Sequence, residues 1–478
     1  TGQVRPRVFM PPARSVAARR VHLVAQRTRR TWRHHQHHAV HHGPDDQYLH
    51  RESDQRKEQH ADQLQGEQAK QRNHTDRENR LQHFVFLPEF LPRVRSPLAG
   101  SFGPPDIVPD APHPRHFVSH TTADIAVVGA GVAGLSSALA LADAGLDVAL
   151  ITDARAGEAS PAAGGILDTG HGFILPAHRE MMRGARDLWP AFSAMLTERT
   201  GVQIPLNRDG VLELATSIHE AERLSALATD EAEWLDAVAL AALEPNLAHA
   251  QGALRFRHDG AVNPLVLLKA LKQAIGRHVH ARVISQTVAS IDPGSAAEGV
   301  TVKMIDGTTL TAMRVVVACG AWSGSLPGVP MHLPISPVRG QLMSVASKAL
   351  RHVVMLGDGY VIPRGDGRTI IGGTEEHMGF DVRHTEEGAQ RVRALAAAIL
   401  PALGTAGMLS TWAGLRPMTR DGLPIIGADA EVPSVIYACG HGRNGILLTP
   451  LTGALVAATV AGTLPTTDAT PFSPLRFT

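Results

Sequence analysis

A glycine-rich turn between an apolar strand and a helix is the feature that most restricts how this chain can fold. Residues 124–153 read DIAVVGAGVAGLSSALALADAGLDVALITD. The apolar run 125–128 is typical of a buried parallel strand, and the alanine- and leucine-rich run 135–144 favours a helix. Between them lies the spacing G-x-G-x-x-G, which permits a tight turn, the close approach of a pyrophosphate and close helix–strand packing. Because a second strand follows at 147–151, the stretch predicts a dinucleotide-binding unit.

The start of this helix is suited to phosphate, since its free N–H groups and the positive end of its dipole lie together. The residues expected around the pyrophosphate are Gly129, Gly131, Val132, Ala133 and Gly134. An acidic residue about 20 positions further on normally binds the ribose hydroxyls. Asp153 lies 24 residues after Gly129 (153 − 129), at the end of the second strand and next to Thr152, so both are expected at the ribose.

Length and charge narrow the class of protein. With 478 residues, the chain is long enough for two or three domains. The net charge of +1 gives no support for binding to nucleic acid or to an anionic membrane. No apolar run reaches the roughly 20 residues that a membrane span needs. The two cysteines, Cys319 and Cys439, are too few for a disulfide framework and suit a reducing compartment, so we expect a cytoplasmic protein.

Residues 1–120 differ in composition from the rest of the chain. Arg, His and Gln dominate, and no apolar period is sustained, so little surface can be buried to offset the entropy of ordering. We interpret this stretch as a disordered or wrongly translated extension. An organelle transit peptide is the alternative, because the first forty residues are rich in Arg and contain no acidic residue. The histidines of 34–38 lack Cys or carboxylate partners at ligand spacing, so we expect no metal site.

The pattern after the first unit favours FAD over NAD. An NAD enzyme would normally continue with regular βαβ units, whereas here small residues crowd the loop 154–167. Glycine turns return after apolar strands near 318 and 438, which predicts an α/β chain with discontinuous domains. A helix is expected over 177–200, kinked or split at Pro190. Another is expected to start near Ile446, where its positive end would stabilise reduced flavin.

From about residue 123 to its end, the chain resembles the D-amino-acid-oxidase-type flavoproteins, and among them most closely the glycine oxidases of thiamine biosynthesis. The motifs that carry the resemblance are GAGVAGLSSALALADAG, EASPAAGGIL, GVLELA, VVVACGAWS, PVRGQL, YVIPRGDGRTIIGGTEE, WAGLRPMTRDGLPIIG and GHGRNGILLTP. The resemblance implies non-covalently bound FAD in a Rossmann-like α/β domain. It also implies an interleaved substrate domain, built on a mixed or antiparallel sheet that covers the flavin.

These implications divide the chain into alternating segments. We expect the FAD domain to comprise three of them, 121–200, 261–332 and 412–478. We expect the substrate domain to comprise the other two, 201–260 and 333–411.

The resemblance also assigns site residues. Arg416 in GLRP and Arg443 in GHGRNG match positions that hold the substrate carboxylate, and Tyr360 in YVIPR matches a tyrosine of the substrate pocket. A planar guanidinium can grip a carboxylate through two parallel hydrogen bonds. The alternatives are ordinary ion pairs for the arginines and a packed strand aromatic for the tyrosine. The further flavin contacts implied are Ala159, Ser160, Gly164, Gly165, Ile166, Val288, His441, Gly442, Arg443, Asn444, Gly445, Ile446 and Leu447.

Three positions depart from the pattern of the family. The usual ribose-binding glutamate falls on Thr152, with Asp153 one place later, which shifts or weakens that contact. Gly442 replaces a common Tyr or Phe and is expected to open space near the flavin. Glu375 stands where some relatives carry an apolar residue above the substrate, which would alter side-chain selectivity.

The resemblance implies oxidative deamination of glycine and small amines. Hydride leaves the substrate Cα for flavin N5, O2 becomes H2O2, and water converts the imine to glyoxylate and ammonia; the imine could instead be handed to a thiazole synthase. One alternative is a D-amino-acid dehydrogenase that passes electrons to quinone or another acceptor. A non-catalytic flavin-binding subunit is a second. Covalent flavin is disfavoured, since neither cysteine lies in GLRP or GHGRNG. The oligomeric state stays open, a homo-oligomer included.

Overall fold

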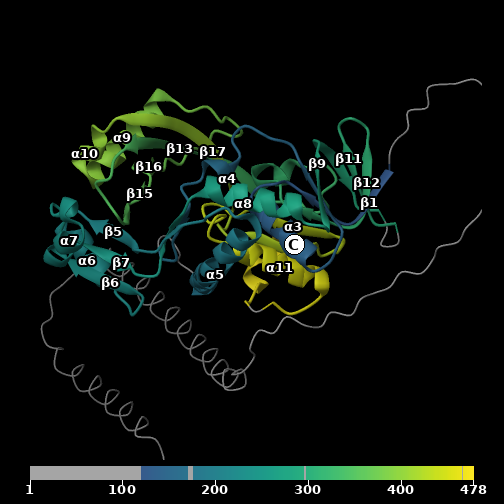
Figure 1. The fold of residues 1–478 in the computed structure, drawn as a ribbon, viewed down its shortest axis with the longest axis horizontal. Helices are drawn as coiled ribbons and strands as arrows, with labels where there is room; N and C mark the ends of the chain where they lie inside the picture. The colour runs from purple at the N-terminus through teal and green to yellow at the C-terminus, as the bar shows by residue number, and fades with distance from the viewer. Residues whose placement is uncertain (1–119, 171–175, 295–297, 466, 478) are drawn as a thin grey trace, which may run out of the picture. The chain divides into compact units, whose positions relative to one another are not determined.

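The computed structural model describes residues 120–170, 176–294, 298–465 and 467–477. The extension expected over 1–120 lies outside the described residues except for the last of its positions. In the part that is described, the α/β class expected from the sequence is confirmed, with two large sheets that carry helices (Figure 1). None of the helices described there is long and apolar enough to cross a membrane.

The first large sheet has eight strands and is built around the dinucleotide unit. β1 (His120–Val128) lies parallel to β2 (Val148–Thr152) on one side and to β12 (Thr309–Val317) on the other. The order is β10-β11-β12-β1-β2-β9, with β19 paired to β12 and β18 to β19. The other strands are β9 (Ala281–Ser285), β10 (Val288–Asp292), β11 (Val300–Met304), β18 (Ile425–Ala428) and β19 (Val435–Cys439).

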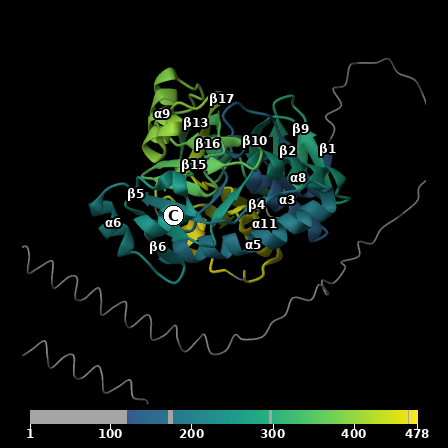
Figure 2. The ribbon, with the colours of Figure 1, turned by 60° about the vertical axis from the view of Figure 1, so that its left-hand side comes forward.

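Both faces of the central strand are buried, as expected for a parallel sheet. Ile125 and Val127 pack against helices on one face, whereas Ala126 and Val128 pack on the other face in a cluster that includes Val302. The helices on the first face are α3 (Val132–Asp143), α5 (Pro176–Thr200), α8 (Pro264–Arg277) and α11 (Thr449–Ala461). They lie together in both views (Figure 1, Figure 2).

Two of these helices differ from the expectation. α5 continues through Pro190 and is not split there. α11 begins at Thr449 rather than near Ile446, and a turn precedes it. A glycine allows α11 to lie close to α3, because a Cβ at Gly453 would stand 2.6 Å from the backbone oxygen of Ser136. This contact fixes the last helix beside the one that follows the glycine turn.

The second large sheet also has eight strands, in the order β17-β13-β16-β15-β14-β5-β7-β6. Its longest pair is antiparallel and consists of β13 (Ile335–Ala346) and β17 (Met408–Thr419). β5 and β14 are parallel, so the sheet is mixed, as expected. α9 (Glu386–Ile399) packs on it. The other strands are β5 (Val211–Ala215), β6 (Ala232–Asp236), β7 (Gly252–Phe256), β14 (Val353–Leu356), β15 (Gly359–Pro363) and β16 (Arg368–Gly372).

Shorter elements complete the described fold. β3 (Ile166–Leu167), β4 (Leu206–Asn207) and β8 (Gly260–Val262) form a three-stranded sheet. The short helices are α4 (Ala159–Ala162), α6 (Ile218–Ser225), α7 (Ala237–Leu243) and α10 (Pro401–Gly404). The 3-10 turns are η2 (Pro245–Leu247), η3 (Gly320–Ser325), η4 (Thr470–Phe472) and η5 (Pro474–Phe477). Strands of the two sheets alternate along the chain, and β17 spans the position where we placed the 411/412 boundary. The domain boundaries stay a prediction.

Candidate active site

A cavity of about 860 Å³ is lined by residues of both large sheets. The glycine turn after β1, the loop after β2, strands β13, β15 and β17, and the loop before α11 all contribute to it. Every residue named above as a pyrophosphate, ribose, flavin or substrate contact lines this cavity, except Gly134 and Leu447. Glu375, expected above the substrate, is not among the lining residues either. The fold therefore brings together segments that lie up to about 300 residues apart in the sequence.

The glycine turn forms a cradle that side chains would fill. Gly129 has a φ of +107°, and a Cβ there would stand 2.4 Å from the backbone oxygen of Ala318. A Cβ at Gly134 would stand 1.8 Å from the backbone oxygen of Gly129, so Gly134 serves the packing of α3 on β1. The backbone N–H of Val132 donates to Ser160 Oγ at 3.1 Å. Because the glycines carry no side chains, a pyrophosphate can approach the backbone of this turn closely, and these residues fit FAD.

The carboxylate at the end of β2 is held by two residues that the sequence did not single out. Arg155 Nε lies 3.0 Å from Asp153 Oδ2, and Thr287 Oγ1 donates to the same oxygen at 2.8 Å. The guanidinium of Arg155 also lies over the ring of Trp322, with 5.6 Å to its centroid. Asp153, one place after the usual acidic position, is therefore oriented at the cavity wall. An arginine two residues after Asp153 was a signal available in the sequence.

A half-buried arginine supports the small-residue loop. Arg364 donates to the backbone oxygens of Gly164, at 2.5 Å, and of Val262, at 3.1 Å. Burial lowers the pKa of Arg364 to about 10, so it is still charged at neutral pH. Gly165 has a φ of +84°, and a Cβ there would stand 2.1 Å from the same Val262 oxygen. The loop is consequently tied to the turn after β15, a contact between segments about 200 residues apart.

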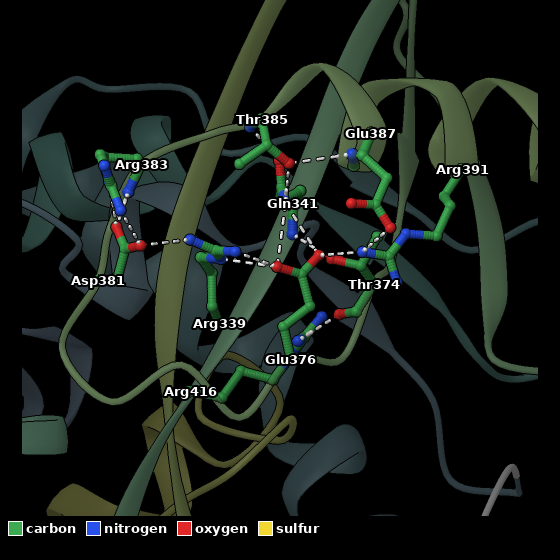
Figure 3. A network of polar contacts seen from close by, with 11 residues as sticks. Arg339, Gln341, Thr374, Glu376, Asp381, Arg383, Thr385, Glu387, Arg391 and Arg416 are labelled. Carbon is green, nitrogen blue, oxygen red and sulfur yellow. Dashed lines mark hydrogen bonds and ion pairs between the residues drawn. The ribbon is translucent and has the colours of Figure 1, made fainter.

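Arg416 and Tyr360 lie side by side and pack closely against glycines of the second sheet. A Cβ at Gly373 would stand 3.0 Å from both Arg416 Nη2 and Tyr360 Cε1, and one at Gly340 would stand 2.3 Å from Arg416 Nη1. Arg416 Nη1 donates to the backbone oxygen of Thr374 at 2.9 Å (Figure 3). Among the described residues, no carboxylate lies within ion-pair distance of Arg416. Its guanidinium is thus held from one side and available to a carboxylate.

A buried polar network holds the segment that contacts Arg416. Arg339 Nη2 lies 2.6 Å from Glu376 Oε2, Gln341 Nε2 donates to Glu376 Oε1 at 2.8 Å, and the Gln341 N–H donates to Thr374 Oγ1 at 2.9 Å (Figure 3). Burial raises the pKa of Glu376, but hydrogen bonds from Thr374, Arg339 and Gln341 outweigh it and leave the pKa below its ordinary value. Residues 374–376 are therefore fixed on β13, and with them the carbonyl that orients Arg416.

Arg443, unlike Arg416, is already paired. Its guanidinium contacts the Glu375 carboxylate through Nη2 and lies 3.4 Å from Asp358 Oδ1 through Nη1. Burial lowers the pKa of Arg443, but the hydrogen bond and the charge of Glu375 outweigh this, so the pKa lies above its ordinary value. The two arginines that the sequence paired thus line one cavity in different electrostatic states.

The loop before α11 places an uncharged imidazole at the cavity. His441 is buried, its Nε2 lies 2.9 Å from Thr452 Oγ1, and burial lowers its pKa to about 4. The next residue, Gly442, has a φ of +55°, and a Cβ there would stand 3.0 Å from Met418 Sδ. Met418 therefore occupies part of the space that the sequence suggested would be open. Leu447 lies outside the cavity wall, and its backbone oxygen accepts from Trp189 Nε1 at 3.0 Å.

A glycine cradle at a βα turn and a large cavity between two sheets are the features of a flavin-dependent oxidoreductase. The chain belongs to the family described as FAD dependent oxidoreductase (DAO), which matches residues 124–459. It is an enzyme family, and the cofactor is FAD, as the sequence predicts.

The particular relatives narrow this class. The chain is 34% identical over 367 residues to the glycine oxidase of Geobacillus kaustophilus, covering 74% of this chain and 97% of the relative. It is 31% identical over 371 residues to the bifunctional protein ThiO/ThiG of Synechocystis sp., covering 75% and 54%. The crystal structure of glycine oxidase from Geobacillus kaustophilus superimposes with a TM-score of 0.70 at 32% identity, covering 74% of this chain and 98% of that one.

Proposed function

We propose that this protein catalyses the FAD-dependent oxidative deamination of glycine and other small amines. Overall, glycine, O2 and water would give glyoxylate, ammonia and H2O2. The observation that carries the proposal is the Arg416 guanidinium, which lies in the cavity beside Tyr360 without a carboxylate partner among the described residues. The glycine oxidases among the relatives support the choice of substrate.

The residues of the chain would bind and orient the substrate. Arg416 would hold the substrate carboxylate through two parallel hydrogen bonds, and its own position is set by Thr374 and by Gly340 and Gly373 beneath it. Such positioning can lower a barrier by roughly 7–11 kcal/mol in the best cases. Tyr360, packed against Gly164, would limit the space for a substrate side chain.

Bound FAD supplies the acceptor for the hydride that leaves the substrate Cα, and O2 then takes up the electrons as H2O2. The pyrophosphate would be held by the turn at Gly129 and Gly131, and the ribose by Asp153. The flavin would be held by the loop at Gly164 and Gly165 and by the loop 441–446. His441 would stay uncharged beside it, because burial holds its pKa at about 4. No side-chain base is required, since the reacting amine is neutral.

The imine product could also be passed on. The chain is similar to one part of a bifunctional protein ThiO/ThiG, which supports a hand-off of glycine imine to a thiazole synthase in thiamine biosynthesis. Both cysteines are free, which fits a cytoplasmic location.

One assay tests the proposal. The full chain, loaded with FAD, is mixed in air with glycine, sarcosine, D-alanine or D-proline, while flavin bleaching and peroxide are followed. We expect bleaching and stoichiometric peroxide with glycine and at least one other amine. Flavin that stays oxidised with all four amines would rule out amine oxidation. Bleaching without peroxide would replace the oxidase with a dehydrogenase that uses another acceptor.

A further inference from the structure

Three chain segments meet at Arg443. Arg443 lies in the loop between β19 and α11, Asp358 in the turn between β14 and β15, and Glu375 just after β16. Glu375 also follows Thr374 directly, and the Thr374 carbonyl accepts from Arg416. Glu375 itself is not among the residues that line the cavity, but it contacts the surroundings of both arginines. It is bonded to one of them and adjacent to the carbonyl that orients the other.

The charges around this point are unequal. Arg416 contributes one positive charge with no carboxylate paired to it among the described residues. At the other arginine, one guanidinium meets two carboxylates, so Arg443, Glu375 and Asp358 together carry a net charge of −1. The cavity wall thus carries an unpaired positive charge at Arg416, which attracts a carboxylate, and a net negative charge around Arg443, which repels one.

The two carboxylates at Arg443 differ in their exposure to water. The Glu375 side chain is 35% exposed, whereas that of Asp358 is 77% exposed and its oxygen lies 3.4 Å from the guanidinium. Water screens a charge more strongly the more it is exposed, so Glu375 has the larger effect on Arg443. Removing the Glu375 charge should release a guanidinium that already faces the cavity.

We propose that Glu375 is the residue that restricts this enzyme to amines with a single carboxylate. It occupies Arg443, so that Arg416 is left as the carboxylate receptor, and it places net negative charge where a second substrate carboxylate would lie. The inference rests on the proposed function and names its substrate class: neutral amino acids and amines, with amino dicarboxylates rejected.

Binding of non-oxidisable acids tests this without turnover. The FAD-loaded full chain is titrated with acetate and malonate, and with propionate and succinate, by following the change in the flavin absorption spectrum. We expect each diacid to bind the wild type about tenfold or more weakly than its matched monoacid. In Glu375→Gln the diacids should tighten by about tenfold or more, while the monoacids change less than about threefold. An unchanged diacid-to-monoacid ratio in Glu375→Gln would overturn the proposal.

Three further variants make the test specific. Asp358→Asn should shift the ratio in the same direction by less, because that carboxylate is more exposed. Combining Glu375→Gln with Arg443→Met should abolish the gain in diacid affinity; a gain that persists would show that Arg443 is not the released receptor. Glu387→Gln makes the same chemical change at a glutamate that is 81% exposed, and it should leave the ratio unchanged. A shifted ratio in Glu387→Gln would point to net charge alone and refute the assignment.

Measurements of amine oxidation distinguish a failure of the role given to Glu375 from a failure of the proposed function. If the wild type oxidises none of the four amines, the proposed function fails, whatever the acids show. If it oxidises glycine but Glu375→Gln neither changes the acid ratio nor gains activity on D-aspartate, only the role of Glu375 fails. FAD content and thermal unfolding of each variant identify a protein that has not folded, and in that case Asp358→Asn carries the test.

Discussion

At the scale of single residues, the position of the Arg416 guanidinium depends on the lack of a side chain at Gly340. A Cβ at Gly340 would stand 2.3 Å from Arg416 Nη1, so Gly340→Ala should push the guanidinium out of place. Because a displacement of about 1 Å can cost about 100-fold, we expect kcat/KM for glycine to fall by 10- to 100-fold, with a full complement of FAD. Steady-state peroxide assays and flavin absorbance measure the two effects.

A matched control is available in the turn after β15. Gly365 has open space around its Cβ position, so Gly365→Ala should leave kcat/KM unchanged. Equal activity of the two alanine variants would contradict the role given to Gly340.

His441 should make stability depend on pH. In the folded protein its pKa is about 4, against an ordinary value of 6.5. Between these values the unfolded chain binds a proton that the folded protein does not, so stability is complete above pH 6.5 and falls as the pH decreases toward 4. From pH 7 to pH 5 the wild type should lose about 2 kcal/mol more than His441→Gln. Urea unfolding at both pH values measures this, and identical losses would argue that the imidazole is protonated in the fold.

The motifs predicted which residues line the cavity, but not the charge state of each. Arg416 and Arg443 look alike in sequence, as arginines in two motifs of one family. Only the folded chain brings Glu375 and Asp358 to Arg443 and leaves Arg416 with the carbonyl of Thr374. Such pairings join segments far apart in the chain, and local patterns carry no information about them.

At the scale of elements, a buried ion cluster joins α5 to the three-stranded sheet. Arg186 Nη1 lies 3.2 Å from Asp259 Oδ1, and Thr169 donates to the same carboxylate through its N–H at 2.8 Å. Burial and the nearby Asp168 raise the pKa of Asp259 to about 7, while the Thr169 hydrogen bonds and the charge of Arg186 act the other way. The side chain of Asp259 is fully buried, so the ionised form of its carboxyl group depends on these partners for stabilisation.

Arg186→Met should therefore destabilise the protein by about 3–5 kcal/mol, since it leaves a buried carboxylate without its ion partner. The loss should be larger at pH 8 than at pH 6, because Asp259, with a folded pKa of about 7, is ionised at the higher pH and only the ionised carboxylate needs the charge of Arg186. Arg183→Met is the matched control: Arg183 pairs with Glu231 at 3.2 Å with 38% of its side chain exposed, so about 0–1 kcal/mol is expected. Denaturant unfolding at the two pH values measures the free energy of unfolding of each variant. Equal losses of that free energy in both variants would refute the role of the buried cluster.

Helix ends show where sequence reasoning succeeds and where it fails. The strand, turn and helix at 124–144 follow from a pattern in which each residue agrees with its neighbours. The start of α11 does not follow the glycine loop directly. Pro450 lacks an N–H and suits the first turn, so Thr449 is the natural first residue. Pro190 is tolerated inside α5, where Trp189 and Leu196 are buried, because packing outweighs helix propensity.

At the scale of the whole molecule, the cavity exists only where the two large sheets meet. The sequence predicts that strands of two sheets alternate along the chain, because glycine turns return after apolar strands. It does not predict the partners of β17, which pairs with β13 over its full length and carries Arg416 into the cavity. Strand pairing is set by packing between distant segments. The fold class could therefore be predicted from local patterns, whereas the position of Arg416 could not.

Arg364 is the link through which the second sheet should affect FAD. It lies just after β15, and it donates to the carbonyls of Gly164 and Val262, which belong to the loop expected at the flavin and to β8. Hydrogen bonds from a charged group contribute about 1.5–3 kcal/mol each, so Arg364→Met should weaken FAD binding by about 10- to 100-fold. Titration of the apoprotein with FAD, followed by flavin fluorescence, measures the dissociation constant.

Arg368 provides the control for the effect of Arg364→Met on FAD affinity. Arg368 is the first residue of β16, is 47% exposed and pairs with Asp366 at 2.6 Å, so Arg368→Met should leave FAD affinity unchanged. FAD binds only the folded chain, and saturation at 100 times its dissociation constant should stabilise the wild type by about 2.7 kcal/mol. At that same FAD concentration, Arg364→Met should lose about 1.3–2.3 kcal/mol of this stabilisation and Arg368→Met none of it. If both variants bind FAD like the wild type, the two sheets hold the cofactor independently and the coupling through Arg364 does not exist.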